Sequence, residues 1–600
     1  MDDTNEIGTS LGRKSWSTKC FEFSSRLTRK KTNIGKALDT NLRRCLSTLD
    51  ITLMAVGHMV EAGVYVLTAT VAKSMAGPAI VLAFLFSGFA SFLAALCYAE
   101  LGVRYPKSGS AYSYTYMAVG ELWAFLVGWN MALEHTIGAA ATARAASAYI
   151  DSLAGYHIKN GTMSFTGPIE APMIADYLDF FAVFILFIFV IYLSFGVKMT
   201  SYLNNLFTVI NIGVIILIIG VGAYFADIKN WTNPETGGFM PYGWSGVFEA
   251  SASCFYAYIG FEAIAACSEE AKDPKKSIPR ATMAAMGIAA IGYIGTATVL
   301  TLMVNYKDIQ DESGIPEALG SHGAEWAKIA VIVGAVCGTS TGIIGSLFAL
   351  TRVIYVMADD GLLLNFCSKV NKKTQIPLRA MYVFSFLSFI TTLLLDINAL
   401  VEVISIGTLF AYIVVSASVI ILRYKPSDLT EKDVLELTQN DDPLKSNSIP
   451  LTDTGGELRD NFEWMKRFID WSPGKLVTHS VVYYCVTTFL LCGFIRIFSS
   501  YLDCWWAIII VVILLVGFIL SFFTISIHKQ SISPLCYKVP IVPLVPAMSI
   551  LVNIILIVNL QPATWVRLFI WIAVGLVLYF FYGIKNSKEE MPPLPSSVRN

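Results

Sequence analysis

Long apolar segments recur along this 600-residue chain and constrain its fold more than any other feature. Several reach the roughly 20 residues that an α-helix needs to cross a hydrocarbon core of about 30 Å. Hydrophobic residues make up 55% of the chain and charged residues 14%, and a soluble protein of this length has too little interior for so much apolar side chain. The sequence therefore predicts an all-α polytopic membrane protein.

The lengths and spacing of the apolar segments predict about fourteen membrane-spanning helices. Ten precede a long polar stretch and four follow it. The first ten lie near residues 51–74, 78–102, 119–152, 176–197, 201–225, 245–268, 280–305, 325–357, 379–396 and 400–423. The last four lie near residues 476–497, 502–526, 541–560 and 564–584.

Basic residues indicate the orientation, because short cytoplasmic loops retain Lys and Arg. The segment 1–47 is rich in both and is expected inside the cell, as is the short tail 586–600. Counting spans outward, the basic loops 272–280 and 369–373 are cytoplasmic as well. The loop 308–325 is acidic and falls outside, so the count is self-consistent.

Two glycosylation sequons agree with this orientation. Asn160-Gly161-Thr162 and Asn230-Trp231-Thr232 both fall in loops that are expected to be extracytoplasmic. They favour a glycoprotein of the secretory pathway, with the plasma membrane as the expected location and an endolysosomal membrane as the alternative. The sequence does not indicate an oligomeric state.

The polar stretch 425–475 is rich in Asp, Glu, Ser, Thr, Pro and Gly, and predicts a disordered or loosely ordered cytoplasmic linker. It separates a ten-span transport core, residues 48–424, from four further spans in 476–585. Many secondary transporters consist of two five-helix repeats of opposite orientation, each of which begins with a broken helix. We expect such inverted repeats at about 48–225 and 245–424.

Broken helices are indicated at matching places in the two halves. The first span contains GHMVEAGVYV from Gly57 to Val66, and the sixth contains YAYIGFE from Tyr256 to Glu262. A break frees backbone groups that water does not reach, so it persists where it lines a cavity or binds a ligand. The alternative for Gly260 is a glycine that allows close helix packing. Matching breaks favour a transporter.

Other classes of protein lack support in the sequence. No Cys-x-x-Cys pair and no Cys/His cluster with metal-ligand spacing occurs along the chain, so we expect no metal site. The G-x-x-x-x-G-K-[ST] loop of nucleotide-driven pumps is missing too. We expect no cofactor, no enzymatic nucleophile–base pair and no nucleic-acid partner. The expected partners are a small-molecule substrate and the lipid bilayer.

Several longer motifs resemble one known family. They are CYAELGVRYPKSGSAYSYTY (97–116), VGELWAFLVGWN (119–130), CFYAYIGFEAIAACSEEAKDPKKSIP (254–279), RVIYVMADDGLL (352–363) and KVPIVPLVPAMSILVNI (538–554). These segments are similar to the cationic amino acid transporters of the amino acid–polyamine–organocation superfamily. The resemblance implies a LeuT-type core of ten helices plus four more, and facilitated transport of arginine, lysine or ornithine.

An amino acid substrate would need partners at both breaks. N–H groups at the amino end of a half-helix bind a carboxylate, and here that end comprises Val60, Glu61, Ala62 and Gly63. Freed carbonyls would accept from the α-ammonium group. The candidates are Tyr256, Ala257 and Ile259. The resemblance implies the same roles.

A cationic side chain also needs a counter-charge inside the membrane. The intramembrane carboxylates are Glu61, Glu100, Glu121, Glu134, Glu262 and Glu402. Glu100 and Glu121 are expected near cytoplasmic helix ends, where pairing with Arg104 or a backbone group is an equal alternative. Glu134 lies well inside the third span. Glu262 follows the second break, where the family has an acidic residue, and it either contacts substrate or closes a gate.

Two uncharged positions bear on pocket shape and ion coupling. Ser346 lies in the small-residue run GTSTGIIGS, which provides space for a long side chain or, equally, for close helix packing. The resemblance places the side-chain pocket there. Asn211 stands where ion-coupled relatives have Lys or a hydroxyl, so coupling through this position is not expected and uniport is favoured.

Glu61 is the main departure from the family pattern, which has glycine at this position. An ionised Glu61 would repel an incoming carboxylate and attract an additional amine, unless Arg144 or a substrate cation compensates it, His58 hydrogen-bonds it or the side chain turns into a polar gap. Three hypotheses therefore stay open: a cationic amino acid transporter, a carrier for polyamines or other amines, and a non-transporting amino acid sensor.

Overall fold

The computed structural model describes residues 23–31, 42–61, 63–167, 175–310, 314–395, 397–426, 455–467, 473–531, 535–560 and 562–589. Within these ranges the chain is helical and has two isolated β-bridges in place of any strand. Among the described residues, eight helices are long and apolar enough to cross a membrane, and three further apolar helices are shorter. The all-α class is confirmed, and the count of about fourteen spans stays a prediction.

A helical segment lies at the position of each expected span. The first group is α2 (Thr48–Met59), α3 (Thr68–Val71), α4 (Ile80–Arg104), α6 (Glu121–Leu153), α8 (Phe180–Leu193) and α9 (Val197–Tyr224). The second group is α11 (Gly243–Cys254), α12 (Ala263–Ala266), α13 (Pro274–Met303), α15 (Glu325–Asp359), α16 (Leu378–Leu394) and α17 (Ile397–Arg423). The third group is α19 (Lys475–Ile497), α20 (Trp505–Ser526), α21 (Leu544–Val558) and α22 (Pro562–Leu578).

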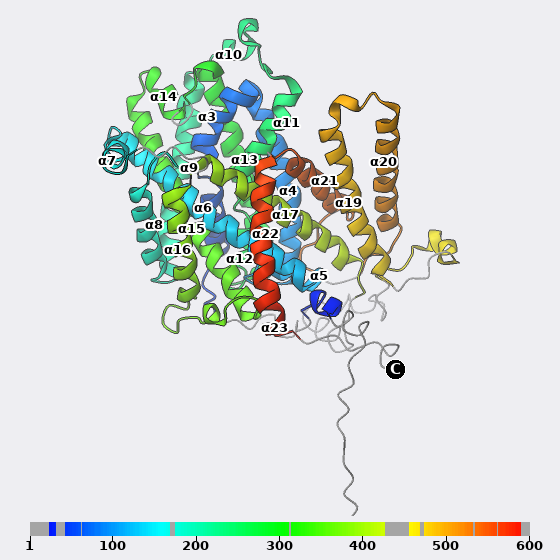
Figure 1. The fold of residues 1–600 in the computed structure, drawn as a ribbon. Coiled ribbons are helices and arrows are strands. Elements are labelled where there is room, and N and C mark those ends of the chain that lie inside the picture. The colour runs from blue at the N-terminus through cyan, green and yellow to red at the C-terminus, as the bar shows by residue number, and fades with distance from the viewer. Residues whose placement is uncertain are drawn as a thin grey trace, which may run out of the picture.

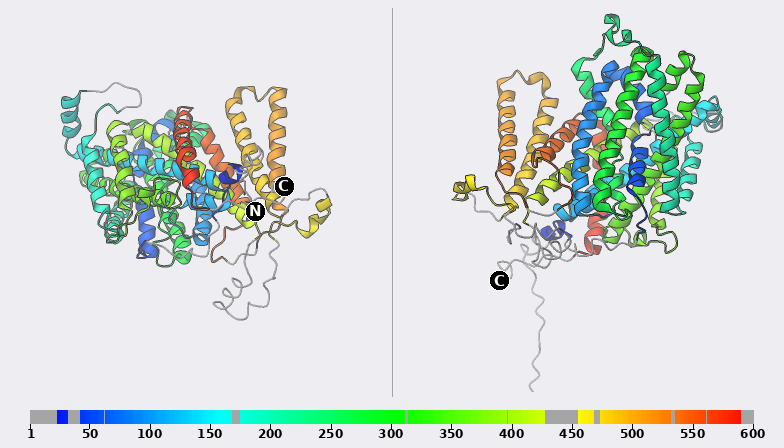
Figure 2. Two further views of the ribbon diagram at one scale, coloured as in Figure 1. Left: turned by 60° about the horizontal axis from the view of Figure 1, so that its bottom comes forward. Right: turned by 180° about the vertical axis from the view of Figure 1, so that it is seen from behind.

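Shorter helices connect these segments: α5 (Ala111–Ala118), α7 (His157–Thr166), α10 (Lys229–Thr232), α14 (Gly314–Ser321) and α23 (Ile584–Asn586). The long helices α6 and α15 pack along each other inside the bundle, and α2, α9, α16 and α17 pack around them (Figure 1). Helices α19 and α20 form a hairpin that stands beside the bundle and contacts it through α17 and α21 (Figure 2). The centre of the bundle is therefore enclosed by the first two groups of helices.

Helix α2 begins and ends for identifiable reasons. Ser47 caps it, since its hydroxyl accepts from the Asp50 N–H while the Asp50 carboxylate accepts from the Ser47 N–H. The helix ends at Met59, because Val60 leaves helical geometry with φ −85° and ψ 72°. A π-helical turn, Gly63–Leu67, then resumes the span. The first predicted break is therefore present.

The second break follows α11. A 3₁₀ turn, Phe255–Tyr258, continues α11, and Ile259 is extended. Gly260 has φ +121°, a conformation that side chains with a Cβ rarely adopt. The chain becomes helical again at Ala263. Both breaks thus lie where the sequence predicts them.

Part of the segment predicted as a linker is packed. Arg459 N–H donates to the Ile527 carbonyl at 2.9 Å, and Lys529 N–H donates to the Glu457 carbonyl at 2.7 Å. These bonds hold residues 456–459 against the end of α20. Residues 427–454 and 468–472 lie outside the described part of the chain.

Candidate functional site

The two breaks lie against each other at the centre of the bundle. A Cβ atom at Gly260 would lie 3.0 Å from the carbonyl carbon of His58, and one at Gly63 would lie 2.9 Å from the Ala257 Cβ. Any larger residue would force the breaks apart. The glycines therefore permit close approach of the two half-helices as well as the backbone bend.

Side chains from α13 and α9 satisfy carbonyl groups that the breaks release. The Tyr293 hydroxyl lies 2.6 Å from the Met59 carbonyl oxygen and 2.7 Å from that of Ala257. Asn211 donates its amide N–H to the Val60 carbonyl at 2.7 Å and accepts a hydrogen bond from the Tyr65 hydroxyl. Buried polar backbone in a membrane protein needs such partners.

These bonds bear on the backbone groups predicted to bind an amino acid. The carbonyls of Ala257 and Tyr256 are engaged, the first by Tyr293 and the second by the Ile259 N–H at 3.1 Å. Gly63 opens the π-helical turn, so its N–H is at a helix start. Ala62 lies outside the described residues.

Glu61 is buried, with 8% of its surface exposed, and reaches from the first break toward α6 and α15. Thr142 of α6 donates its hydroxyl to the Glu61 carboxylate at 3.1 Å. On α15, a Cβ at Gly342 would overlap this carboxylate, so glycine provides the space for it. The side chain therefore occupies a fitted position between helices.

The structure corrects both compensating partners suggested for Glu61. His58 bonds to Ser346 instead, with 3.1 Å between Nε2 and the hydroxyl oxygen, because α2 turns its imidazole toward α15. Arg144 donates to the Thr392 carbonyl at 3.0 Å and lies over the Tyr177 ring. It lies on α6 two residues after Thr142, which binds Glu61, but its guanidinium is used to hold α16.

The predicted pocket at Ser346 is lined by this chain's own histidine. A Cβ at Gly345 would lie 2.5 Å from the His58 ring, and one at Gly138 would lie 3.0 Å from the Ser346 hydroxyl. Small residues here admit the imidazole between α6 and α15. The small-residue run GTSTGIIGS therefore allows close helix packing and also provides space for a side chain, which here is that of His58.

Glu262 and Glu134 lie together beside the second break. One Glu262 oxygen accepts from the Gly260 N–H at 3.0 Å and from the Tyr412 hydroxyl at 3.1 Å. Near Glu134, the Thr408 hydroxyl donates to the Ile404 carbonyl at 3.0 Å. Glu134 Oε1 and Glu262 Oε1 are buried and have no hydrogen-bond partner in the described part of the chain. Two carboxyl oxygens are thus available to a ligand.

The remaining glutamates have different surroundings. Glu100 pairs with Arg423 at 2.7 Å and not with Arg104, because α17 ends beside α4. Glu121 pairs with Arg29 at 2.7 Å. Pairing was one of the predicted alternatives, but Arg104 was the wrong partner: Glu100 is held by Arg423 and the Val539 N–H, and Glu121 by Arg29. The side chain of Glu402 lies outside the described residues.

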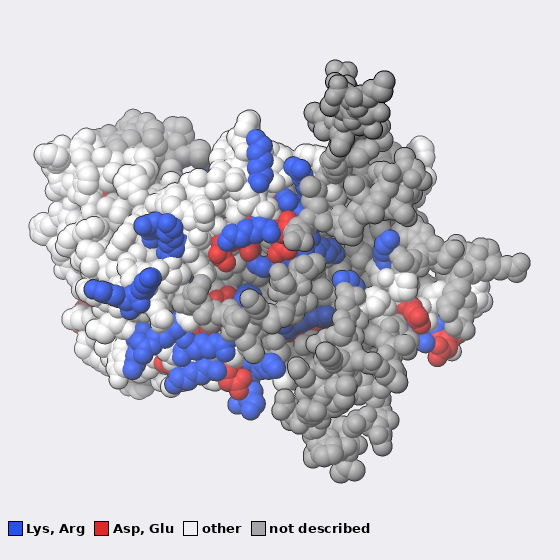
Figure 3. Space-filling view, turned by 90° about the horizontal axis from the view of Figure 1, so that it is seen from below, with Lys and Arg blue, Asp and Glu red and all other residues white. Residues whose placement is uncertain are grey.

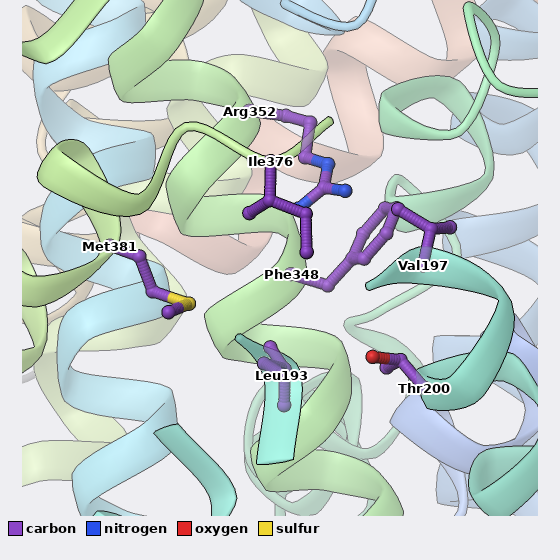
Figure 4. Close-up of a pocket in the computed structure, with 7 residues that line it drawn as sticks. All are labelled: Leu193, Val197, Thr200, Phe348, Arg352, Ile376 and Met381. Atoms are coloured by element: carbon purple, nitrogen blue, oxygen red, sulfur yellow. The ribbon is translucent and has the colours of Figure 1, made fainter. Parts of the chain in front are cut away.

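A separate narrow pocket lies between α8, α9, α15 and α16 (Figure 4). It has no room for a water molecule, and Arg352 and Thr200 are its polar lining residues. Arg352 is already bound to Glu270 at 2.8 Å and lies over the Phe348 ring. Because none of the predicted substrate residues lines this pocket, it is a packing gap apart from the central site.

Four site residues escaped the sequence reasoning: His135, Thr142, Tyr293 and Tyr412. Thr142 had a signal, since it lies eight residues after Glu134 and Gly138 lies between them, on one face of a helix. Tyr293 and Tyr412 are aromatic residues in apolar helices and had no such signal. The sites they complete depend on contacts between distant helices.

A bundle of apolar helices with two apposed breaks and buried carboxyls beside them has the architecture of a secondary transporter. The amino acid permease family model matches residues 46–452, and the model for the C-terminus of these permeases matches residues 537–587. The chain belongs to this family, which confirms a multi-pass membrane transporter and not an enzyme.

Named relatives agree with the resemblance found in the sequence. The chain is 41% identical to "Cationic amino acid transporter 4" of Homo sapiens, over 95% of this chain and 92% of that protein. It is 31% identical to "Cationic amino acid transporter 4, vacuolar" of Arabidopsis thaliana, over 91% and 92%. Among solved structures it is similar to MhsT in complex with L-phenylalanine, with 14% identity, a TM-score of 0.47 and coverage of 63% and 90%.

Proposed function

We propose that this protein moves cationic amino acids, namely arginine, lysine and ornithine, across a membrane by facilitated diffusion with alternating access. The observation that carries the proposal is the pair Glu134 and Glu262, which is buried beside the second break without a Lys or Arg partner among the described residues. Buried charge of this kind must be offset by a cation or a proton. A guanidinium or ammonium side chain supplies that cation.

The remainder of the substrate fits the two breaks. Its carboxylate would accept from N–H groups at the start of the π-helical turn at Gly63. The Tyr293 hydroxyl has one proton and two carbonyls within reach, those of Met59 and Ala257. When it donates to Met59, the Ala257 carbonyl is open to the α-ammonium group.

Uniport follows from the surroundings of Asn211. This side chain is 1% exposed, and both its donor and its acceptor are used to hold the first break. An amide does not change charge at physiological pH. Asn211 therefore stabilises the first break, at the position where ion-coupled relatives have an ionisable or hydroxyl group.

Glu61 supports the second candidate, an amine carrier. Its carboxylate is placed at the break that would receive a substrate carboxylate, and it lies close enough to Glu262 for their like charges to interact. A substrate with two amino groups has no carboxylate for Glu61 to repel, and its positive charges would offset the repulsion between Glu61 and Glu262. Putrescine is the simplest example.

Uptake into proteoliposomes tests these candidates. Labelled arginine and labelled putrescine are supplied separately to vesicles that contain wild-type protein. Saturable arginine uptake without an ion gradient supports the proposal, and putrescine uptake without arginine uptake supports the amine carrier. Substrate-dependent thermal stabilisation without flux of either compound would indicate a sensor.

Regarding orientation, we propose that the face shown in Figure 3, where Lys and Arg side chains gather, is cytoplasmic. The side chain of Asn160 in α7 is exposed and available for glycosylation. The Asn230 side chain donates to the Leu302 carbonyl at 2.6 Å, so its modification requires that bond to break. We place the protein in the plasma membrane.

Protease treatment of sealed right-side-out vesicles tests this orientation. We expect the 425–475 segment to be protected and a mobility shift from glycan at Asn160. Cleavage of this segment from outside would overturn both the orientation and the ten-plus-four division of the chain.

A further inference from the structure

Three potential metal ligands meet at the second break. Glu134 and His135 are adjacent in α6, and Glu262 immediately precedes α12. One ligand atom from each, a carboxylate oxygen or a ring nitrogen, lies within 4.8 Å of the other two. The residues are 127 or more positions apart between the two helices, so spacing along the chain gave no sign of this cluster.

The cluster is buried and has unused bonding capacity. Glu134, His135 and Glu262 are 4%, 2% and 2% exposed. Glu134 Oε1, Glu262 Oε1 and His135 Nε2 have no hydrogen-bond partner in the described part of the chain. Leaving a buried polar atom without a partner is unfavourable, so three such atoms at one place indicate a missing ligand.

The second oxygen of Glu262 is held by the protein. The Tyr412 hydroxyl and the Gly260 N–H both donate to it. Such outer hydrogen bonds orient the carboxylates of metal sites and leave one oxygen for the ion. The arrangement is therefore more than a group of acidic side chains that happen to be near each other.

The donor set selects among cations. Mg²⁺ and Ca²⁺ prefer oxygen ligands alone, whereas one imidazole nitrogen with two carboxylates suits Zn²⁺ and its neighbours. Zinc binds these atoms at about 2.0–2.2 Å and keeps a fourth position open in sites with three protein ligands. Tetrahedral ligands at that distance lie about 3.3–3.6 Å apart, so the ligand atoms must approach each other by at most about 1.5 Å.

We propose that Glu134, His135 and Glu262 bind a divalent metal ion of the zinc class. Because the proposed cationic side chain uses the same two carboxylates, metal and substrate exclude each other. Zinc is then an inhibitor that acts at the centre of the transport path. This step builds on the proposed function for its effect on uptake, whereas the binding of metal itself is independent of it.

Titration calorimetry of the purified, metal-stripped full-length protein with ZnCl₂ tests the site. We expect one site in wild type and at least about tenfold weaker binding in His135→Ala, since loss of even an outer-shell partner costs 10- to 100-fold. His479→Ala removes an exposed histidine and should bind as wild type does. His135→Gln repeats the test if the alanine variant is unstable. Equal affinity in all folded variants overturns the proposal.

Cobalt as a spectroscopic probe identifies the ligands. Bound Co²⁺ should show visible absorption of an oxygen and nitrogen site, without the near-ultraviolet band of cobalt–thiolate bonds. A thiolate band would assign the metal to cysteine and contradict the site. Arginine should weaken zinc binding. If zinc binds through His135 and arginine is neither transported nor competitive, the metal site stands and the proposed function fails.

Discussion

Two sets of buried glutamates in this protein differ in their partners. Near the ends of the core helices three glutamates are each paired with an arginine, whereas three at the centre have no Lys or Arg partner in the described part of the chain. The paired group is Glu100 with Arg423, Glu121 with Arg29 and Glu270 with Arg352, at 2.7–2.8 Å. The unpaired group is Glu61, Glu134 and Glu262.

This difference separates structural charge from functional charge. Each arginine pair joins segments that are remote in sequence, as where Glu121 binds Arg29, Tyr579 and Ser587 from both ends of the described chain. Their negative charge is offset by an arginine within the fold. The central carboxylates are also buried and have no basic partner in the described part of the chain, so we propose that their charge is offset by a cation that arrives from outside.

Arg423→Met should have the largest effect on stability. It leaves Glu100 buried without its cation, and loss of one partner of a buried pair costs about 3–5 kcal/mol. Unfolding of the protein in mixed micelles, titrated with sodium dodecyl sulfate, measures the free energy of unfolding. The double variant Glu100→Gln, Arg423→Met should recover most of the loss. Equal stability of Arg423→Met and wild type would remove the distinction between the two groups.

Glu262→Gln should give the opposite pattern: unchanged or higher stability and weaker binding of arginine. The variant removes a charge that the fold does not pair, and substrate affinity should fall by about 1–3 kcal/mol, the value of a charged hydrogen bond. Substrate-induced thermal shifts and uptake measure affinity. Glu270→Gln is the matched control. It should lower the free energy of unfolding and leave the affinity for arginine unchanged. Unchanged arginine affinity in Glu262→Gln would make Glu262 structural.

The sequence predicts the breaks and their carboxylates because these signals are local. Glycines at 57, 63 and 260 inside apolar segments mark backbone irregularity, and Glu262 directly follows one of them. A charged residue in a membrane segment is itself a functional signal. Fold class, family and the positions of both broken helices could therefore be predicted from the chain alone.

Partners are harder to predict because they depend on which helices meet. Glu100 finds Arg423 across 323 residues in place of the nearby Arg104, and His58 reaches Ser346 across 288. His135 reads as an isolated histidine in an apolar helix until Glu262 is placed beside it. Long-range pairing of this kind leaves no periodic pattern in the sequence.

Glu61→Gly tests the third central carboxylate, with an expected effect on substrate choice. Loss of its charge should raise arginine uptake relative to putrescine, because an ionised Glu61 repels a carboxylate at the first break. Initial rates between pH 5 and 8 measure the ratio, and acidification of wild type should partly imitate the mutation, since protonation removes the same charge. Glu61→Gln separates charge from side-chain volume. A constant ratio in both variants would place Glu61 outside the substrate's reach.

Lys276→Ala should have the smallest effect and shows whether burial or pairing distinguishes the groups. Lys276 lies 3.9 Å from Asp273, and the two side chains are 70% and 51% exposed. Exposed pairs contribute about 0–1 kcal/mol, and a lysine in the first turn of α13 opposes the helix dipole, so the two contributions nearly cancel. We expect a change within about 0.5 kcal/mol in the same micelle titration, and normal arginine uptake. A loss comparable to that of Arg423→Met would mean that ion pairing stabilises this fold regardless of burial. The absence of a basic partner would then no longer distinguish the central carboxylates as functional groups.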